Sequence, residues 1–166
     1  TGGTPNHNRI IRNLCTALTL GLRGQPYDVF VADQRLWIPE TQMFTYPDVM
    51  VVKGELVYLE GRRDTITNPM VIIEVLSKST REYDRGDKFA AYRTIPTVRE
   101  YLLVDQYRYQ VDHYAKTGEN QWLFQVYDGP ESVVEFAAIN GTINGAIALQ
   151  DTYDKVEFEP VDSEIV

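Results

Sequence analysis

Apolar residues recur every three or four positions near the start of the chain. Ile10, Leu14, Leu18 and Leu22 keep one face of residues 6–22 apolar. This spacing predicts an amphipathic helix, because side chains three or four apart lie on the same helix face. Glycines at the end of the window are typical of a helix that stops there.

Short apolar and β-branched runs follow and predict a series of strands. We expect these strands at residues 27–32, 35–38, 47–53, 56–59, 71–76, 101–104, 107–114, 122–126, 133–138 and 146–149. The run 71–76 is almost wholly apolar, which is typical of a strand buried on both faces. Residues 60–69 are polar and predict a loop, whereas 107–114 and 122–126 predict a hairpin.

A second helix is expected at residues 84–94, and Pro96 ends the helical pattern. The order of helix, strands, helix and strands predicts a mixed α/β or α+β fold, with a central sheet packed by two helices. The length of 166 residues favours a single domain over residues 1–166. Because the sequence opens on Thr1 without a methionine or a signal-peptide pattern, we expect a trimmed form of a longer chain.

The composition limits the kinds of binding site and metal site that the chain can form. The chain has 16 basic and 24 acidic residues, a net charge of −8, which argues against broad salt-driven binding of nucleic acid but leaves room for a local basic groove. One cysteine and two histidines exclude a disulfide framework, a Cys-rich zinc site and a multi-histidine cage. A bound metal would be held by carboxylates, which favours magnesium, manganese or calcium. Apolar runs are too short to cross a bilayer, so we expect a soluble cytoplasmic protein without membrane contact.

Two carboxylates stand in apolar surroundings. Asp48 opens one expected strand, and Glu74 lies inside another. Strand alternation places Glu74 on the face of Ile72, and Asp48 on the face of Met50. An ionised carboxylate buried without a partner costs several kcal/mol, so each acid is either paired with a basic residue or bound to a metal. If the two strands are neighbours, the carboxylates converge.

The second helix adds a cation to this picture. Asp84 and Lys88 are four residues apart, and Tyr92 continues the same stripe one turn later. One interpretation is an ordinary solvated salt bridge. The other places a lysine ammonium beside two metal-binding carboxylates. Hydrolysis of a phosphodiester uses that combination, in which a divalent cation lowers the pKa of bound water and positive charge stabilises the transition state.

These residues, in this order, resemble the PD-(D/E)XK nuclease superfamily and, more narrowly, the Uma-two family of bacterial restriction-endonuclease-like proteins. The matching stretches are 46–49, 73–80, 84–92 and 100–105, together with the N-terminal helix, so that the resemblance runs from residue 2 to about 150. It implies a restriction-endonuclease-like fold, with a central mixed β-sheet flanked by helices and additional antiparallel strands.

The resemblance also implies an activity. It implies a magnesium-dependent endonuclease that hydrolyses double-stranded DNA as a homodimer, with manganese as a possible substitute. Asp48, Glu74 and the backbone carbonyl of Val75 would hold the metal. Lys88 would orient or activate the attacking water, and Asp84 and Tyr92 would support the site.

One position departs from the superfamily pattern. The lysine expected two residues after the acid is Leu76 here. The resemblance implies that the lysine has moved to the following helix, which selects Lys88, and Lys78 in the intervening turn is the competing candidate. The family segment upstream of residue 1, which carries a further acidic residue, is not in this sequence.

Other residues have an ordinary explanation beside a functional one. His7 lies on the apolar side of the first helix, where a capping or core role is the default and an active-site role the alternative. Five arginines could form a rim that contacts phosphates, or could be solvated charges: Arg62, Arg63, Arg81, Arg85 and Arg93. Two other functions stay open: a non-catalytic binding or assembly module, which the net charge favours, and a phosphodiesterase acting on RNA or nucleotides. No Gly-rich phosphate loop supports a nucleotide substrate.

Overall fold

The computed structural model describes residues 3–77, 84–139 and 146–159, and gives only the backbone of Asp84 and Arg85. Its helical elements are α1 (Pro5–Gly21), a π-helical turn η1 (Asp84–Lys88) that continues into α3 (Phe89–Tyr92), and α4 (Leu149–Thr152). Within these ranges no helix combines the length and apolar character that a membrane span requires.

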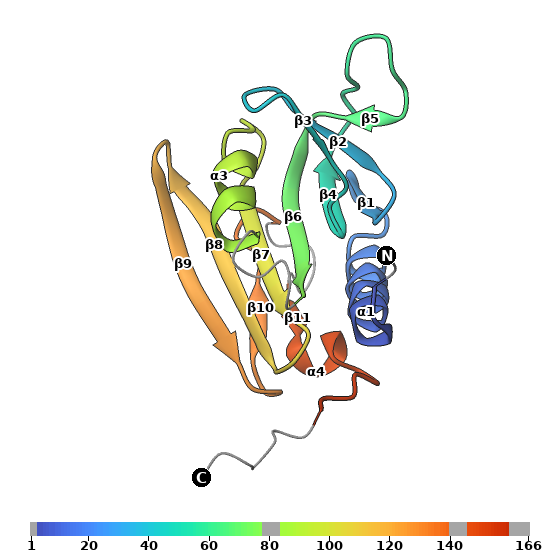
Figure 1. Cartoon of the computed structure of the whole chain (residues 1–166), viewed down its shortest axis with the longest axis vertical. Coiled ribbons are helices and arrows are strands. Elements are labelled where there is room, and N and C mark those ends of the chain that lie inside the picture. Colours follow the sequence, from blue (N-terminus) through green and yellow to red (C-terminus); the bar gives the residue numbers. More distant parts are fainter. Residues whose placement is uncertain (1–2, 78–83, 140–145, 160–166) are drawn as a thin grey trace.

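A six-stranded sheet forms the centre of the molecule (Figure 1). Its strands, in spatial order, are β1 (Tyr27–Val31), β4 (Val49–Lys53), β6 (Pro69–Leu76), β7 (Glu100–Asp105), β8 (Gln110–Gly118) and β9 (Gln121–Asp128). β6 and β7 run parallel, and every other neighbouring pair is antiparallel, so the sheet is mixed. A parallel pair needs a crossover connection, and the segment that contains η1 and α3 supplies it.

Two small sheets complete the fold. One is three-stranded, in the order β3 (Met43–Thr45), β2 (Arg35–Ile38) and β5 (Thr65–Ile66). The other pairs β10 (Val133–Glu135) with β11 (Ala146–Ala148). In Figure 1 the three-stranded sheet lies toward one end of the long axis, and α4 lies toward the other.

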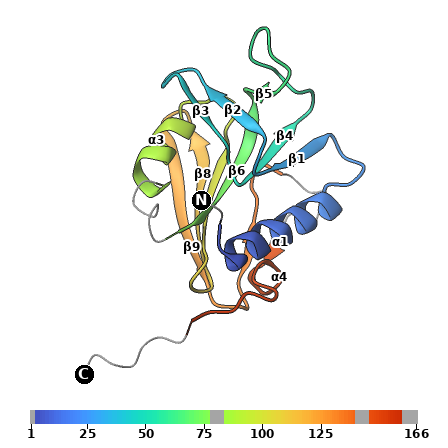
Figure 2. The same ribbon diagram turned by 45° about the vertical axis from the view of Figure 1, so that its right-hand side comes forward.

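The central sheet carries a core on each face, and α1 and α3 lie on opposite sides of it (Figure 2). The first core packs α1 on the sheet and contains Ile10, Leu14, Leu18, Val49, Val51, Val71, Ile73 and Val75. The second packs the α3 region on the sheet and contains Met50, Val52, Ile72, Leu76, Tyr92, Ile95, Tyr101 and Leu103. All eight residues of β6 are buried, because the strand is covered on both faces.

The mixed fold expected from the sequence is confirmed, and so are the N-terminal helix and the β8–β9 hairpin. The strand expected at residues 56–59 is wrong: within it the structure has only an isolated bridge from Tyr58 to Ile66. The side chain of Asn68 accepts a hydrogen bond from the Val57 amide, so a side-chain amide replaces the strand partner there. The expected polar loop 60–69 contains β5 and the first residue of β6.

Three local features were missed. Strand β3 is only three residues long and largely exposed, so it carries no apolar run. Helix α4 is a single turn for which the sequence predicts no helix, and its first residue, Leu149, falls in the strand expected at residues 146–149. The expected helix at residues 84–94 begins as a π-helical turn and becomes α-helical only at Phe89–Tyr92. A π-helix has a wider turn, so the i,i+4 alignment assumed for Asp84 and Lys88 does not hold there.

Candidate functional site

The carboxylates of Asp48 and Glu74 lie at two neighbouring strands, β4 and β6. β4 and β6 pair antiparallel with Val49 opposite Ile73, so Asp48 and Glu74 lie together at the end of their shared ladder. Their alternate neighbours Met50 and Ile72 belong to the core that packs the α3 region. The shared face expected from strand alternation is therefore confirmed for these neighbours.

Glu74 is almost fully buried, with 2% of its surface exposed. Its Oε1 accepts a hydrogen bond from the Tyr92 hydroxyl at 2.8 Å, and the Lys88 ammonium nitrogen lies 3.5 Å from the same oxygen. Burial, and next the nearby charge of Glu74, raise the pKa of Tyr92, so its hydroxyl stays protonated and donates. Lys88 and Tyr92 thus supply a cationic and a neutral partner to this carboxylate, both from the η1–α3 segment.

Asp48 is held by backbone and by the first helix. Its Oδ2 accepts a hydrogen bond from the Val75 amide at 2.8 Å, and His7 Nε2 lies 3.3 Å from that oxygen. Burial alone would raise the pKa of Asp48, but hydrogen bonds from His7 and Val75 outweigh it and lower the pKa below its ordinary 3.8. Glu74 also helps to lower the pKa of Asp48, so the two side chains are near enough to interact.

A hydrogen-bonded chain holds the start of α1 against the site. The Thr4 hydroxyl caps α1 by accepting the His7 amide at 3.1 Å. The same hydroxyl donates to Gln106 Oε1 at 2.7 Å, and Gln106 Nε2 donates to the Leu76 carbonyl at 2.7 Å. Helix α1 is therefore tied to the carboxyl end of β6, which brings His7 to Asp48.

This group of atoms fits a hard divalent cation. Within the described ranges no three His, Cys, Asp or Glu side chains form a metal cage. Mg²⁺ does not need such a cage, because it is commonly bound by one or two carboxylates and keeps several waters. A residue of an extended strand points its N–H and C=O to the same side, so the Val75 carbonyl shares the side on which its amide meets Asp48. Two carboxylates and one carbonyl make an all-oxygen donor set.

Some expected residues cannot be placed. Lys78 and Arg81 lie outside the described residues, as does the side chain of Asp84. Of the arginines expected to form a rim, Arg62 is paired with Asp64 at 3.0 Å, and Arg93 lies over the Phe89 ring. Neither arginine lies in the group formed by Asp48, Glu74 and Lys88.

Sequence reasoning missed two buried polar features. Gln106 is 2% exposed and follows directly on β7, where a polar residue just after a buried strand was an available signal. Glu100 is fully buried and lies 2.8 Å from His113 Nε2. That pair sits in the β7–β8 ladder, on the opposite face from Glu74, and alternation along two strands could have indicated it.

Most of this sequence is similar to that of known proteins. The model of the Uma2 family, described as "Putative restriction endonuclease", matches residues 1–148. The protein sll1609 of Synechocystis is 44% identical over 136 residues, which is 82% of this chain and 77% of that protein. The protein slr1290 of the same organism is 36% identical over 132 residues, covering 78% of this chain and 67% of that protein.

A solved structure shares the fold. The crystal structure of a "putative nuclease belonging to DUF820" from Anabaena variabilis superposes with a TM-score of 0.73, covering 93% of this chain and 83% of that one. The two sequences are 16% identical. At that identity the likeness shows the fold, which confirms the expected restriction-endonuclease-like architecture.

Proposed function

The chain belongs to the Uma2 family, whose description is "Putative restriction endonuclease", and we propose that it is a nuclease that hydrolyses DNA phosphodiester bonds with a divalent metal ion. The metal is Mg²⁺, with Mn²⁺ as a substitute. Double-stranded DNA is the substrate, a homodimer is the working form, and the cytoplasm is the location. One domain spanning residues 1–166 carries the activity.

The observation that supports this proposal is that the Lys88 ammonium lies close to a buried acid, Glu74, and that a second acid, Asp48, lies near Glu74. Glu74 is nearly inaccessible, yet it has the Lys88 ammonium at 3.5 Å and interacts with Asp48. A purely structural ion pair needs only one acid. A second carboxylate at the same point adds like charge, which a bound divalent cation would offset.

The chain's own residues would divide the work. Asp48, Glu74 and the Val75 carbonyl would hold the metal, which when bound makes water a stronger acid and offsets negative charge on the phosphate. Lys88 would orient the attacking water and stabilise the charge that develops on the phosphate oxygens. Tyr92 would keep the Glu74 carboxylate in its rotamer through the 2.8 Å hydrogen bond. His7 would position Asp48 in the same way.

Cleavage of supercoiled and linear plasmid DNA in Mg²⁺ or Mn²⁺, with EDTA as the blank, tests the proposal. We expect wild-type cleavage only with metal. Lys88→Ala should reduce the rate by about 10²–10³-fold, as removal of a group that stabilises transition-state charge does. Lys78→Ala is the matched control and should stay near wild type. No cleavage of any DNA by the folded wild-type protein would contradict the proposal, and the reverse order of the two variants would assign the role to Lys78.

A further inference from the structure

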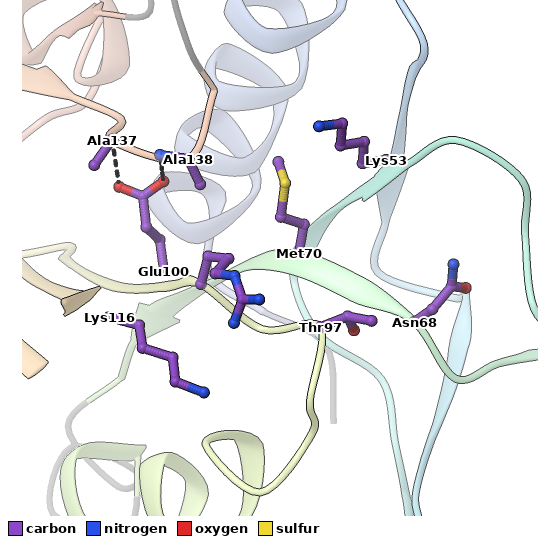
Figure 3. A pocket seen from close by; sticks show the side chains of 9 residues that line it. Lys53, Asn68, Met70, Thr97, Glu100, Lys116, Ala137 and Ala138 are labelled. Atoms are coloured by element: carbon purple, nitrogen blue, oxygen red, sulfur yellow. Dashed lines mark hydrogen bonds between the residues drawn. The ribbon is translucent and has the colours of Figure 1, made fainter. Parts of the chain in front are cut away.

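A cavity of about 480 Å³ lies away from the carboxylate site (Figure 3). Met70 lines it at the start of β6, four residues before Glu74, so the two positions are about 13 Å apart along the strand. Glu100 also lines the cavity. It is two residues from Leu102 of the α1-side core and therefore lies on the same face of β7, whereas Glu74 faces the α3 side. The cavity therefore lies at the opposite end of β6 and toward the opposite face of the sheet.

Three cations line this cavity: Lys53 at the end of β4, Arg99 just before β7, and Lys116 in β8. Within the described part of the chain none of the three has a carboxylate at ion-pair distance. The chain as a whole has a net charge of −8. Three positive charges and one carboxylate, Glu100, line this cavity, so its lining has an excess of positive charge, in contrast to the acidic composition of the chain.

Glu100, the acid of the cavity, makes its hydrogen bonds to groups other than these three cations. Glu100 is fully buried, and its two oxygens accept the amides of Ala137 at 2.9 Å and Ala138 at 3.0 Å. His113 Nε2 lies 2.8 Å from Oε1. Figure 3 shows the carboxylate turned toward Ala137 and Ala138. None of these donors is Lys53, Arg99 or Lys116, and the Arg99 guanidinium donates one hydrogen bond, to the Pro96 carbonyl at 3.3 Å.

The cavity also has an apolar side. Met70 is 6% exposed, and Ala137 and Ala138 also line the cavity. Its volume falls in the range of about 300–1,000 Å³ that is typical of small-molecule sites. An anionic group held by the cations and an organic group against Met70 would fill both parts. An arginine is suited to a phosphate, which it can bind with two parallel hydrogen bonds.

We propose that this cavity is a binding site for a small phosphorylated molecule of the size of a nucleoside monophosphate. Lys53, Arg99 and Lys116 bind the phosphate, and Met70 with the two alanines contacts the organic part. A phosphate of the DNA backbone is the other source of this charge. The hollow shape and the apolar lining favour the small molecule, because a backbone phosphate uses neither. The proposal does not depend on nuclease activity.

Isothermal titration of the full chain with adenosine monophosphate and with inorganic phosphate, at constant ionic strength, tests this site. We expect both to bind, with the nucleotide tighter. Arg99→Ala and Lys116→Gln should each weaken binding by about tenfold, the loss expected for one charge-assisted hydrogen bond. Arg12→Ala, an exposed arginine on α1, is the matched control and should leave affinity within about twofold.

The outcomes separate the alternatives. Absence of binding by both probes would overturn the proposal, and so would equal weakening by Arg12→Ala, since that indicates a general effect of charge. A short DNA duplex, titrated in EDTA, provides the second arm. If Arg99→Ala weakens duplex binding about tenfold while the nucleotide does not bind wild type, the cavity serves the DNA backbone and the proposal is wrong. Arg99 is exposed and Lys116 partly so, and circular dichroism of each variant checks that the fold is kept.

Discussion

Replacing Tyr92 by phenylalanine removes the hydroxyl that donates a hydrogen bond to the buried Glu74. The ring is retained, so its tilted contact with Tyr101 at 5.5 Å between centroids stays. What is lost is the 2.8 Å donor to Glu74 and a 3.3 Å contact with the Thr45 hydroxyl. No water can replace the donor easily, because Tyr92 is 1% exposed and Glu74 is 2% exposed.

A hydrogen bond to a charged group contributes about 1.5–3 kcal/mol, so Tyr92→Phe should lower the free energy of unfolding by that amount. For a chain of this length each kcal/mol shifts Tm by about 2–4 °C, which gives a decrease of about 3–12 °C. Urea unfolding and thermal melts in EDTA measure both quantities. Tyr58→Phe, at an exposed tyrosine, is the matched control and should change Tm by less than about 1 °C.

A double-mutant cycle with Glu74→Gln tests the reason for the loss. The amide oxygen of the substituted residue still accepts a hydrogen bond, but it carries no charge. Tyr92→Phe should then cost only about 0.5–1.5 kcal/mol in the Glu74→Gln background. An equal cost in both backgrounds would refute the reasoning, since it would mean that packing of Tyr92, not its bond to the carboxylate, stabilises the fold.

Two further predictions concern the supports of the site. Because the folded-state pKa of Asp48 is lowered, the stability it contributes is present above its ordinary pKa of 3.8 and is lost as the pH falls through the folded value. Urea unfolding between pH 3 and 6 should therefore show a shallower acid decline in Asp48→Asn than in wild type, and an unchanged decline would contradict this. Gln106→Ala should destabilise the chain by about 1–3 kcal/mol, since it leaves the buried Leu76 carbonyl unsatisfied. The exposed Gln150→Ala should change the free energy of unfolding by less than about 0.5 kcal/mol, and equal losses in the two variants would argue against the tie between α1 and β6.

The parts of this molecule that could be predicted have local signatures. The apolar stripe of Ile10, Leu14 and Leu18 marks a helix, and a charged residue inside the apolar run of β6 marks Glu74. Alternation then places Asp48 and Glu74 on one face. Each of these inferences uses only spacing within one element.

The parts that could not be predicted depend on contacts between distant segments. His7 meets Asp48 only because Thr4 and Gln106, which are 102 residues apart, join α1 to the end of β6. The same holds for the cavity, whose three cations come from three separate segments. Tertiary packing decides these positions, and no spacing in the sequence encodes them.

The hydrophobic pattern also did not predict the helix type of the crossover segment. Its apolar residues have helical spacing, but the segment begins as a π-helical turn and only then becomes α-helical. In this segment Tyr92 packs into the core on the α3 side of the sheet, and Lys88 lies beside Glu74. Such turns are frequent at functional sites, although periodicity alone does not distinguish them from an α-helix.

The central claim is that Asp48 and Glu74 jointly bind a divalent ion. Crystals soaked in Mn²⁺, with anomalous diffraction measured above and below the manganese edge, test it most directly. The account predicts one strong peak in contact with both carboxylates, at about 2.0–2.2 Å from their oxygens, and loss of that peak in Glu74→Gln. The exposed Glu119→Gln variant should keep it. A well-ordered crystal without a peak between Asp48 and Glu74, or with the peak unchanged in Glu74→Gln, would contradict the account.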